Sequence, residues 1–479
     1  MNPRRLFIAS FLTLVVGGLV FALRSSIITD WGRLYGFTQS ELGSISGGGF
    51  TGFGLTIIFF SSFADRVGFG RLMRAAFVLH VASAVVTLIA TPIFHAGGKQ
   101  AAYWTLYTGQ FLFALGNGTC EAVINPLATT LYPAERTHYL NILHAGWPCG
   151  IIIGCLLAWL LAGRASWEVQ MGLFLVPTLA YGALMLGQQF PVSEVKAAGV
   201  TFGAMLLEFA QPVLLVLVCL HALIGYVELG VDGWITNLMT AIANLNGILV
   251  LLYTSCIMFV LRFCAGPLVH RTSPLGLLLC CSILACIGLS ALGKASTGLS
   301  VVVAATIYGI GKTFFWPTML GVVSERFPRG GALTMGTIAG VGMLSAGLLG
   351  TPGIGYVQDY YASKKLSRES PDVYARYAAA TSHRFLFLPK ANGLDGRKVG
   401  ELLGKAQTQL TETERGDLPL VSGARIYGGR MSLKWTAILP GALAAGYLGL
   451  IVYFRKRGGY RQVHIEPVPR EEPIAAGEY

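Results

Sequence analysis

Twelve long apolar runs divide this sequence and constrain its fold more than any other feature. They lie at 6–28, 44–63, 73–94, 103–131, 140–161, 171–190, 213–239, 248–269, 275–292, 299–323, 332–357 and 433–454. A helix needs about 20 apolar residues to cross the hydrocarbon of a bilayer. Because an α-helix also satisfies its own backbone polar groups there, we predict an all-α membrane protein with twelve transmembrane helices.

The composition agrees with this prediction. Only 12% of the 479 residues are charged and 54% are hydrophobic, whereas soluble domains carry about 25% charged residues. The net charge of +12 comes from basic residues at the ends of the runs and in the connections. They form no clustered stripe and accompany no nucleic-acid-binding motif, so we expect contact with membrane lipid and none with nucleic acid.

The cysteines argue against a disulfide-bonded or metal-binding protein, and the first run argues against a cleaved signal peptide. All nine cysteines lie in apolar runs and none forms a CxxC pair, so we interpret them as small packing residues rather than metal ligands or disulfides. The first run follows Arg4 and Arg5 without an A-x-A cleavage site, which predicts a retained helix rather than a signal peptide. We expect no metal and no cofactor.

Lysine and arginine in the short connections predict the orientation of the chain. With the N-terminus in the cytoplasm, the inner side collects Arg4, Arg5, Arg66, Arg71, Arg74, Arg136, Lys196, Arg271, Arg326 and Arg329, and the outer side Arg33, Lys99, Arg164 and Lys294. We therefore predict an integral protein of the bacterial plasma (inner) membrane with both termini in the cytoplasm.

The runs group into two halves. We predict an N-terminal six-helix bundle at 1–190, a cytoplasmic connecting loop at 191–211, a C-terminal six-helix bundle at 212–455 and a cytoplasmic tail at 456–479. Inside the second bundle, the polar stretch 359–431 falls on the extracytoplasmic side and contains an amphipathic helix at 399–410. It is open to two interpretations, a poorly ordered or lightly packed cap or a binding segment.

The chain also repeats itself. The segment 116–133, with Asn125-Pro126 inside it, corresponds to 311–328, with Trp316-Pro317 inside it, and Arg66 corresponds to Arg271. Internal repeats that place a binding site at their interface are typical of secondary transporters. We therefore expect two pseudo-symmetric bundles.

Polar residues in the fourth and fifth runs predict a cavity. Asn117, Glu121 and Asn125 are spaced i, i+4, i+8, and Asn141 and His144 are spaced i, i+3, so each set lies on one helix face. A charged side chain at the bilayer centre costs roughly 2.5–3.5 kcal/mol on insertion scales. Because burial disfavours a charged carboxylate, Glu121 is a candidate proton carrier, with a structural partnership to Arg24 as the alternative.

Other runs hold further candidates. Glu228 and Asp232 are spaced i, i+4, with Trp234 beyond, and Lys312 lies in the tenth run, where it could pair with a carboxylate such as Glu228 or bind an anion. Trp147 and Trp316 are candidates for stacking on a substrate. Four of the candidate residues also have a simpler interpretation. His144 and Trp147 could be packed core residues, Asp232 a solvated residue and Arg24 an interfacial anchor. The Gly311-Lys312-Thr313 triplet is no phosphate-binding loop, because residue 306 is threonine where that motif needs glycine.

These features resemble the major facilitator superfamily, through the twelve runs, the duplication and the turn Asp65-Arg66-x-Gly68. Within it, Glu121-x-x-x-Asn125-Pro126 and Asn141-x-x-His144 resemble the fucose–galactose–glucose:proton symporter branch. The resemblance implies that Glu121 takes part in proton coupling and sugar binding, with Asn125, Asn141 and His144 at matching positions. It also implies a cytoplasmic gate of Asp65, Arg66 and Arg71. The sequence departs from the branch at His144, where glutamine is usual, and at Arg24-Ser25-Ser26, where an asparagine/aspartate pair is expected.

We therefore predict a secondary active transporter, not an enzyme, which couples proton entry to uptake of a small polar solute, first of all a monosaccharide, by alternating access. We expect it to be a monomer. The predicted substrate-binding residues are Asn117, Asn125, Asn141, His144, Trp147, Glu228, Trp234, Lys312, Trp316 and Arg24. Two alternatives stay open: an anion, sugar-acid or drug carrier that uses Arg24 and Lys312, and a non-transporting receptor that acts through 359–431.

Overall fold

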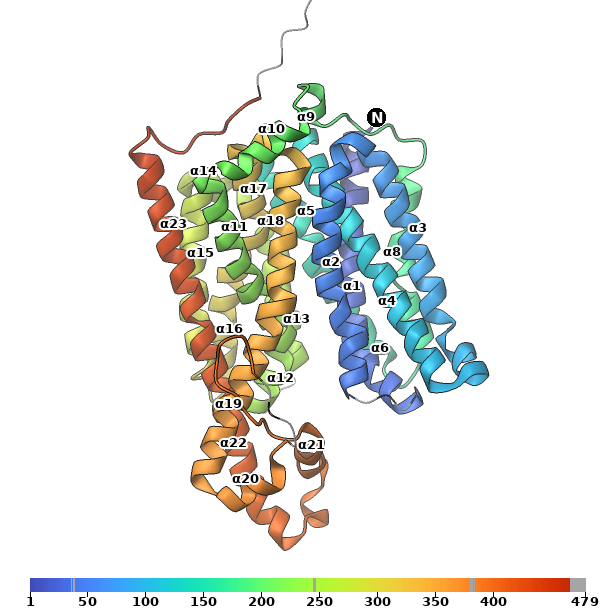
Figure 1. Ribbon diagram of the computed structural model, residues 1–479, viewed down its shortest axis with the longest axis vertical. Helices are drawn as coiled ribbons and strands as arrows, with labels where there is room; N and C mark the ends of the chain where they lie inside the picture. The colour runs from blue at the N-terminus through green and yellow to red at the C-terminus, as the bar shows by residue number, and fades with distance from the viewer. Residues whose placement is uncertain (36, 38, 244–246, 380–381, 383, 466–479) are drawn as a thin grey trace, which may run out of the picture.

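The computed structural model describes residues 1–35, 37, 39–243, 247–379, 382 and 384–465, and these residues fold almost entirely into helices (Figure 1). The described residues of the N-half form the helices α1 (Pro3–Tyr35), α2 (Gln39–Val67), α3 (Phe69–Leu88), α4 (Ala90–Leu131), α5 (Arg136–His144), α6 (Gly146–Leu161), α7 (Trp167–Gly172) and α8 (Leu175–Met185). α4 bends at Gly98, which has a φ of 70° that favours glycine.

A linker with the short helices α9 (Glu194–Ala197) and α10 (Phe202–Leu207) leads to the C-half. The C-half begins with α11 (Pro212–Gly225), the π-helical turn η2 (Tyr226–Gly230), α12 (Val231–Ala243), α13 (Gly247–Arg262), α14 (Ala265–Thr272), α15 (Pro274–Leu292), α16 (Gly298–Lys312) and α17 (Phe315–Arg326). It continues with α18 (Gly331–Ser345), a second π-helical turn η4 (Ala346–Gly350), α19 (Thr351–Glu369), α20 (Pro371–Tyr377), α21 (Gly396–Gly404), α22 (Glu412–Thr436) and α23 (Ile438–Arg455).

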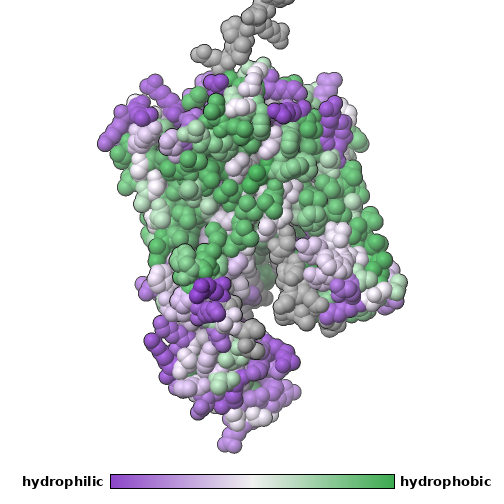
Figure 2. All heavy atoms as spheres, viewed as in Figure 1, coloured by the Kyte–Doolittle hydropathy of each residue, from purple (hydrophilic) through white to green (hydrophobic). Residues whose placement is uncertain are grey.

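Each of the twelve predicted runs falls mainly on one helix or on consecutive helices, and two runs, at 213–239 and 332–357, also include a π-helical turn. Among the described residues, nine helical stretches are long and apolar enough to cross a membrane, and the bent pair α13 and α14 makes a tenth. The two remaining runs lie in α2 and α4. Figure 2 shows the apolar surface as a broad band across the visible face of the bundle, with polar surface at both ends. The chain is an all-α membrane protein.

The predicted repeat is visible in the backbone. The fourth and tenth spans end at Tyr132 (φ −132°, ψ 66°) and Phe327 (φ −127°, ψ 50°), each followed by proline. Gly68 (φ 93°, ψ 141°) and Ser273 (φ 67°, ψ 159°) open α3 and α15 in the same left-handed conformation, at the spacing that relates Arg66 to Arg271. Corresponding turns in the two halves therefore share one geometry.

The halves meet along three main helix pairs: α2 with α18, α5 with α17, and α6 with α13. Glycines permit the close approach of α2 and α18, because a Cβ added to Gly54 would lie 2.9 Å from the carbonyl oxygen of Gly340. Small residues are the usual means of bringing membrane helices together.

The stretch 359–431 forms a small folded unit on the C-half. Its described residues fold around a separate apolar cluster of Ala362, Leu366, Val373, Tyr377, Val399, Leu402, Leu410, Val421 and Ala424. These residues bury a small core of their own, which argues against the poorly ordered form of the cap and leaves a packed cap or a binding segment as predictions. The amphipathic helix predicted at 399–410 is present as α21 but ends at Gly404. We call this unit the insert.

Figure 1 places the start of α1, the linker helices α9 and α10, and the chain that follows α23 on one side of the bundle, and the insert on the opposite side. We call these the linker side and the insert side.

Candidate functional site

A small cavity lies between the two halves near the middle of the spans. Four of its lining residues come from the N-half (Leu14, Glu121, His144 and Trp147) and five from the C-half (Glu228, Leu229, Arg262, Trp316 and Met343). Its volume is about 20 Å³, which is room for about one water molecule. A substrate could therefore enter only if the halves move apart.

The N-half contributes a hydrogen-bonded chain of three predicted residues. The side-chain amide of Asn125 donates to Oε2 of Glu121 at 2.8 Å, and Nε2 of His144 lies 2.8 Å from Oδ1 of Asn125. All three are buried. In the described part of the chain no cation forms an ion pair with Glu121, and Arg24 bonds Gln110 instead. The alternative of a Glu121–Arg24 partnership is therefore wrong.

The C-half contributes a buried ion pair that the sequence analysis missed. Nη2 of Arg262 lies 3.2 Å from Oε1 of Glu228, with both side chains almost fully buried. The same guanidinium donates to the carbonyl oxygens of Thr313 at 2.9 Å and of His144 at 2.5 Å. The bond to His144 crosses between the halves, so Arg262 links the two sets of cavity residues.

Lys312 has a different partner from the one proposed from the sequence. Its Nζ bonds both carboxylate oxygens of Asp232, at 2.5 and 2.7 Å, not Glu228. The interpretation of Asp232 as a solvated residue is also wrong, because its side chain is 6% exposed. The physical reason is η2, since a π turn with its i→i+5 bonds rotates the residues that follow it relative to an α-helix. Lys312 is neutralised by this pair and does not line the central cavity.

The predicted tryptophans separate into two groups. Trp147 and Trp316 border the cavity from opposite halves, and Trp316 packs edge-on against His221, with 4.5 Å between ring centroids. Trp234 lies elsewhere, because its indole N–H donates to the carbonyl oxygen of Thr351 at 2.9 Å. It ties α12 to α19 and does not reach the cavity.

Two predicted asparagines also lie outside the central cavity. Asn141 donates to Oγ1 of Thr318 at 3.1 Å, a contact between the halves. Asn117 lies on the same face of α4 as Glu121, but its Oδ1 is 3.2 Å from Nε2 of His80, whose Nδ1 lies 2.8 Å from the Tyr181 hydroxyl.

Arg24 and Asn117 line a second cavity of about 30 Å³ inside the N-half. Arg24 donates to Oε1 of Gln110 at 3.3 Å. Trp147 borders this cavity as well as the central one, so the two cavities are neighbours that share one wall residue.

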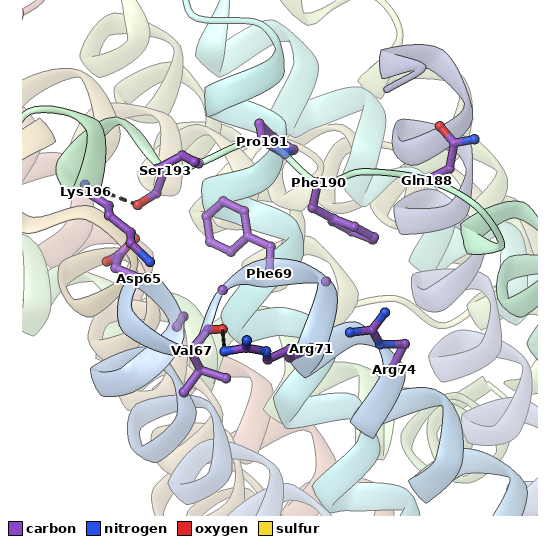
Figure 3. A pocket seen from close by; sticks show the side chains of 14 residues that line it. Asp65, Val67, Phe69, Arg71, Arg74, Gln188, Phe190, Pro191, Ser193 and Lys196 are labelled. Carbon is purple, nitrogen blue, oxygen red and sulfur yellow. Dashed lines mark hydrogen bonds between the residues drawn. The ribbon is translucent and has the colours of Figure 1, made fainter.

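The predicted gate residues lie on the linker side but do not form one charge network. Oδ2 of Asp65 accepts the backbone N–H of Ala332 at 3.3 Å, Arg66 lies over the ring of Phe202, and Arg71 donates to the carbonyl oxygen of Val67. Figure 3 shows Asp65 beside Lys196 of the linker, with Arg71 pointing elsewhere. Within the described residues no ion pair joins the three, so their expected network is replaced by separate contacts of α2 with α18 and with the linker.

Arg262, His80 and His221 are buried polar residues that the sequence analysis did not single out. The signal was available, because each lies within an apolar run just as Glu121 does. Among the described residues there is no group of three or more histidine, cysteine, aspartate or glutamate side chains that could hold a metal ion. The chemistry that the central residues offer is proton exchange and hydrogen bonding to a small polar solute.

Comparisons with known proteins agree with this geometry. The profile of the Major Facilitator Superfamily matches residues 4–351. The chain is 28% identical over 177 residues to a cis,cis-muconate transport protein of Acinetobacter baylyi, a match that covers 36% of this chain and 40% of that protein. The chain thus spans less than half the length of that relative.

Two solved structures have a similar fold. A crystal structure of the Escherichia coli fucose:proton symporter matches with a TM-score of 0.63 and 14% identity, over 93% of this chain and 98% of that one. A bacterial homologue of the human lysosomal transporter Spinster, in an inward-facing and unoccupied conformation, matches with a TM-score of 0.66 and 15% identity, over 95% of this chain and 98% of that one.

Proposed function

Because the chain belongs to the major facilitator superfamily and is therefore a transporter rather than an enzyme, we propose that it couples proton movement to the transport of a small polar solute by alternating access. We propose a monosaccharide as the first candidate solute. The family assignment favours transport over the receptor function considered for the insert.

The observation that carries the proposal is the position of Glu121. It lines the cavity between the halves, and among the described residues its side-chain partner is the neutral amide of Asn125. Glu228, the other carboxylate of the cavity, is paired with Arg262. Glu121 is therefore the acid that can gain or lose a proton without breaking an ion pair.

Protonation of Glu121 would affect the C-half through Asn125, His144 and Arg262. A protonated Glu121 can donate to Oδ1 of Asn125, which would compete with the bond from His144. His144 is also the residue whose carbonyl oxygen accepts from Arg262 across the interface. Protonation thus acts on a contact that must change when the halves move.

The aromatic walls support a sugar substrate. Trp147 and Trp316 face the cavity from different halves, and an indole offers a large apolar face together with one polar N–H. Glu121, His144 and Glu228 supply hydrogen-bonding groups between them. One of the solved structures with this fold is that of a fucose:proton symporter.

A second candidate is an organic anion. The A. baylyi relative is a muconate transport protein, and Arg24 lies in the cavity next to the central one without an ion-pair partner among the described residues. Lys312 does not support this candidate, because Asp232 already neutralises it.

We also propose the orientation and the domain boundaries expected from the sequence. The linker side, with its excess of arginine, would face the cytoplasm of a bacterial cell, and the insert would lie outside the plasma membrane. The halves 1–190 and 212–455 would move as units about the 191–211 connection, in a monomer that needs no second copy to complete its cavity.

The test is sugar uptake by purified protein in liposomes under an imposed pH gradient. One pH unit corresponds to about 1.4 kcal/mol, which permits about tenfold accumulation for a one-to-one symporter. We expect Glu121→Gln to lose this accumulation and retain exchange of sugar across the membrane. Glu401→Gln, at an exposed insert position, is the matched control. Normal accumulation by Glu121→Gln would refute the assigned role.

A further inference from the structure

The second cavity presents hydrogen-bond donors and a cation, without an acidic side chain. Its polar lining residues are Arg24, Gln110 and Asn117, and aromatic and small residues complete the wall. No described side chain that lines it is a carboxylate. The Arg24 side chain is partly buried and bonds the neutral amide of Gln110. A cation that is partly withdrawn from water without an anion is unfavourable, so an anionic ligand would stabilise it.

The hydrogen bonds leave donors free on two of these side chains. Gln110 is 2% exposed, and its Oε1 is occupied by Arg24. Its Nε2 is buried and has no partner. In Asn117, Oδ1 is occupied by His80, while Nδ2 lies 3.6 Å from the position that a Cβ on Gly17 would take. Since Gly17 also lines the cavity, this second amide is placed at its wall.

An unsatisfied buried donor is uncommon in a folded protein and calls for an explanation. A guanidinium and two amide N–H groups around one space match the oxygens of a carboxylate, which only accept hydrogen bonds. The cavity of about 30 Å³ has the room of about two water molecules, which two carboxylate oxygens would replace.

The position of the cavity links this group to the proposed transport site. Trp147 borders both cavities, so a ligand could extend past its indole from one to the other. A sugar ring in the central cavity would then place a carboxyl substituent at Arg24.

We propose that the Arg24–Gln110–Asn117 cavity is a carboxylate-binding subsite and that the transported solute is a carboxylated monosaccharide. This inference rests on the proposed function, because it takes the central cavity to be the sugar site. It deepens that proposal by naming the substrate class and by assigning a role to Gln110.

The experiment compares two probes that differ only at the carboxyl group, D-glucuronate and its methyl ester, in which a methyl group replaces the negative charge. Their affinities for the purified full-length protein are measured by isothermal titration calorimetry. We expect at least about tenfold tighter binding of glucuronate, which corresponds to 1.4 kcal/mol. In Arg24→Gln the ratio of the two affinities should fall to near one, and in Gln110→Leu it should fall several-fold.

Arg164→Gln is the matched control, because the side chain of Arg164 is exposed and donates to the carbonyl oxygen of Leu160, away from both cavities; it should retain the full ratio. Arg24→Lys keeps the charge and should retain part of it. Equal affinity of the wild-type protein for the two probes, binding of neither, or an unchanged ratio in Arg24→Gln would overturn the inference. Proton-driven uptake of a neutral hexose in liposomes tests the proposed function independently of this inference.

Discussion

Arg262 is the residue with the most connections in the central site. Its three nitrogen atoms bond the carbonyl oxygen of Thr313, the carbonyl oxygen of His144 and the carboxylate of Glu228. These partners lie between α16 and α17, at the end of α5 and in η2. Five N–H donors in a planar fork allow arginine, unlike lysine, to hold separate partners in fixed directions.

We expect Arg262→Gln to destabilise the protein by about 3–5 kcal/mol, because removing one partner of a buried ion pair leaves the other charge uncompensated. The free energy of unfolding, measured by denaturant titration in mixed micelles, checks this value. The wild-type protein in the same micelles is the reference.

The neutral double variant Glu228→Gln/Arg262→Gln separates the charge effect from the loss of packing. It should recover about half or more of the stability lost in Arg262→Gln, because no uncompensated charge remains. A double variant that is less stable than Arg262→Gln would show that the pair is not held together by charge.

The sequence predicts which polar residues belong to the site more readily than it predicts which of them pair with each other. Glu121 stands out because a carboxylate inside an apolar run requires a cavity or a partner, and the structure places it at the cavity. The same reasoning applies to Arg262, in the run that carries α13. Which acid pairs with which base could not be predicted, because it depends on helix packing that brings Asp232 and Lys312 together across 80 residues.

At the scale of helices, the two π turns show what run length cannot reveal. η2 and η4 pack against each other through Gly230 and Gly350, and the residues after each turn are rotated relative to a continuous helix. The apolar runs predicted the spans because bilayer thickness sets their length. A π turn changes neither length nor composition, so the rotation of Asp232 away from Glu228 left no trace in the pattern.

The packing of α5 against α17 provides a test of movement between the halves. A Cβ on Gly321 would overlap the side chain of Thr137, so Gly321→Val should force the two helices apart at a cost of about 1–3 kcal/mol. We expect faster amide hydrogen exchange in α5 and α17.

Gly441→Val in α23 is the control for this substitution, since nothing lies within 4 Å of a Cβ at that position. It should leave exchange in α5 and α17 unchanged. Equal exchange in the two variants would mean that α5 and α17 tolerate the wedge without separating.

The stability of α21 in the insert should depend on pH. Asp395 caps α21, and the backbone N–H groups of Lys398 and Arg397 hold the pKa of its carboxyl below the usual range. A carboxyl whose pKa is lower in the folded state stabilises that state above its unfolded pKa, and this stabilisation is lost as the pH falls through the folded pKa. The protection of α21 amides, corrected for intrinsic exchange rates, should therefore fall between about pH 5 and pH 3.

Asp395→Asn retains a capping oxygen but cannot titrate, so its protection should depend less on pH over the same interval. Asp395→Ala should lose protection at every pH. If Asp395→Asn shows the full pH dependence of the wild-type protein, another group is responsible.

At the scale of the whole molecule, contacts between the halves close the linker side. Arg136 donates to the carbonyl oxygen of Ser324 at 2.9 Å, Thr137 to Oε1 of Glu325 at 2.5 Å, and the backbone N–H of Gly266 to Nδ1 of His138 at 2.9 Å. Alternating access requires these bonds to break when the cavity opens on this side. The structure is therefore one state of the proposed cycle, with the linker side shut.

The chain after α23 adds to this closure. The hydroxyl of Tyr460 donates to Oε2 of Glu325 at 2.7 Å, and the backbone N–H of Val463 donates to the carbonyl oxygen of Glu325 at 2.8 Å. Gln462 reaches the N-half, where its side chain donates to the carbonyl oxygen of Pro133 at 3.1 Å. The segment thus joins the end of α17 to the turn between α4 and α5.

Removing residues 460–479 should favour opening on the linker side. Each lost hydrogen bond is worth about 0.5–1.5 kcal/mol, so the loss of the bonds to Glu325 and Pro133 should raise the population of the open state about tenfold or more. Hydrogen exchange in α5 and α17 should accelerate accordingly. Removing only 466–479 leaves these bonds in place and should have no such effect. If both truncations accelerate exchange equally, the bonds of Tyr460, Gln462 and Val463 do not hold the linker side closed.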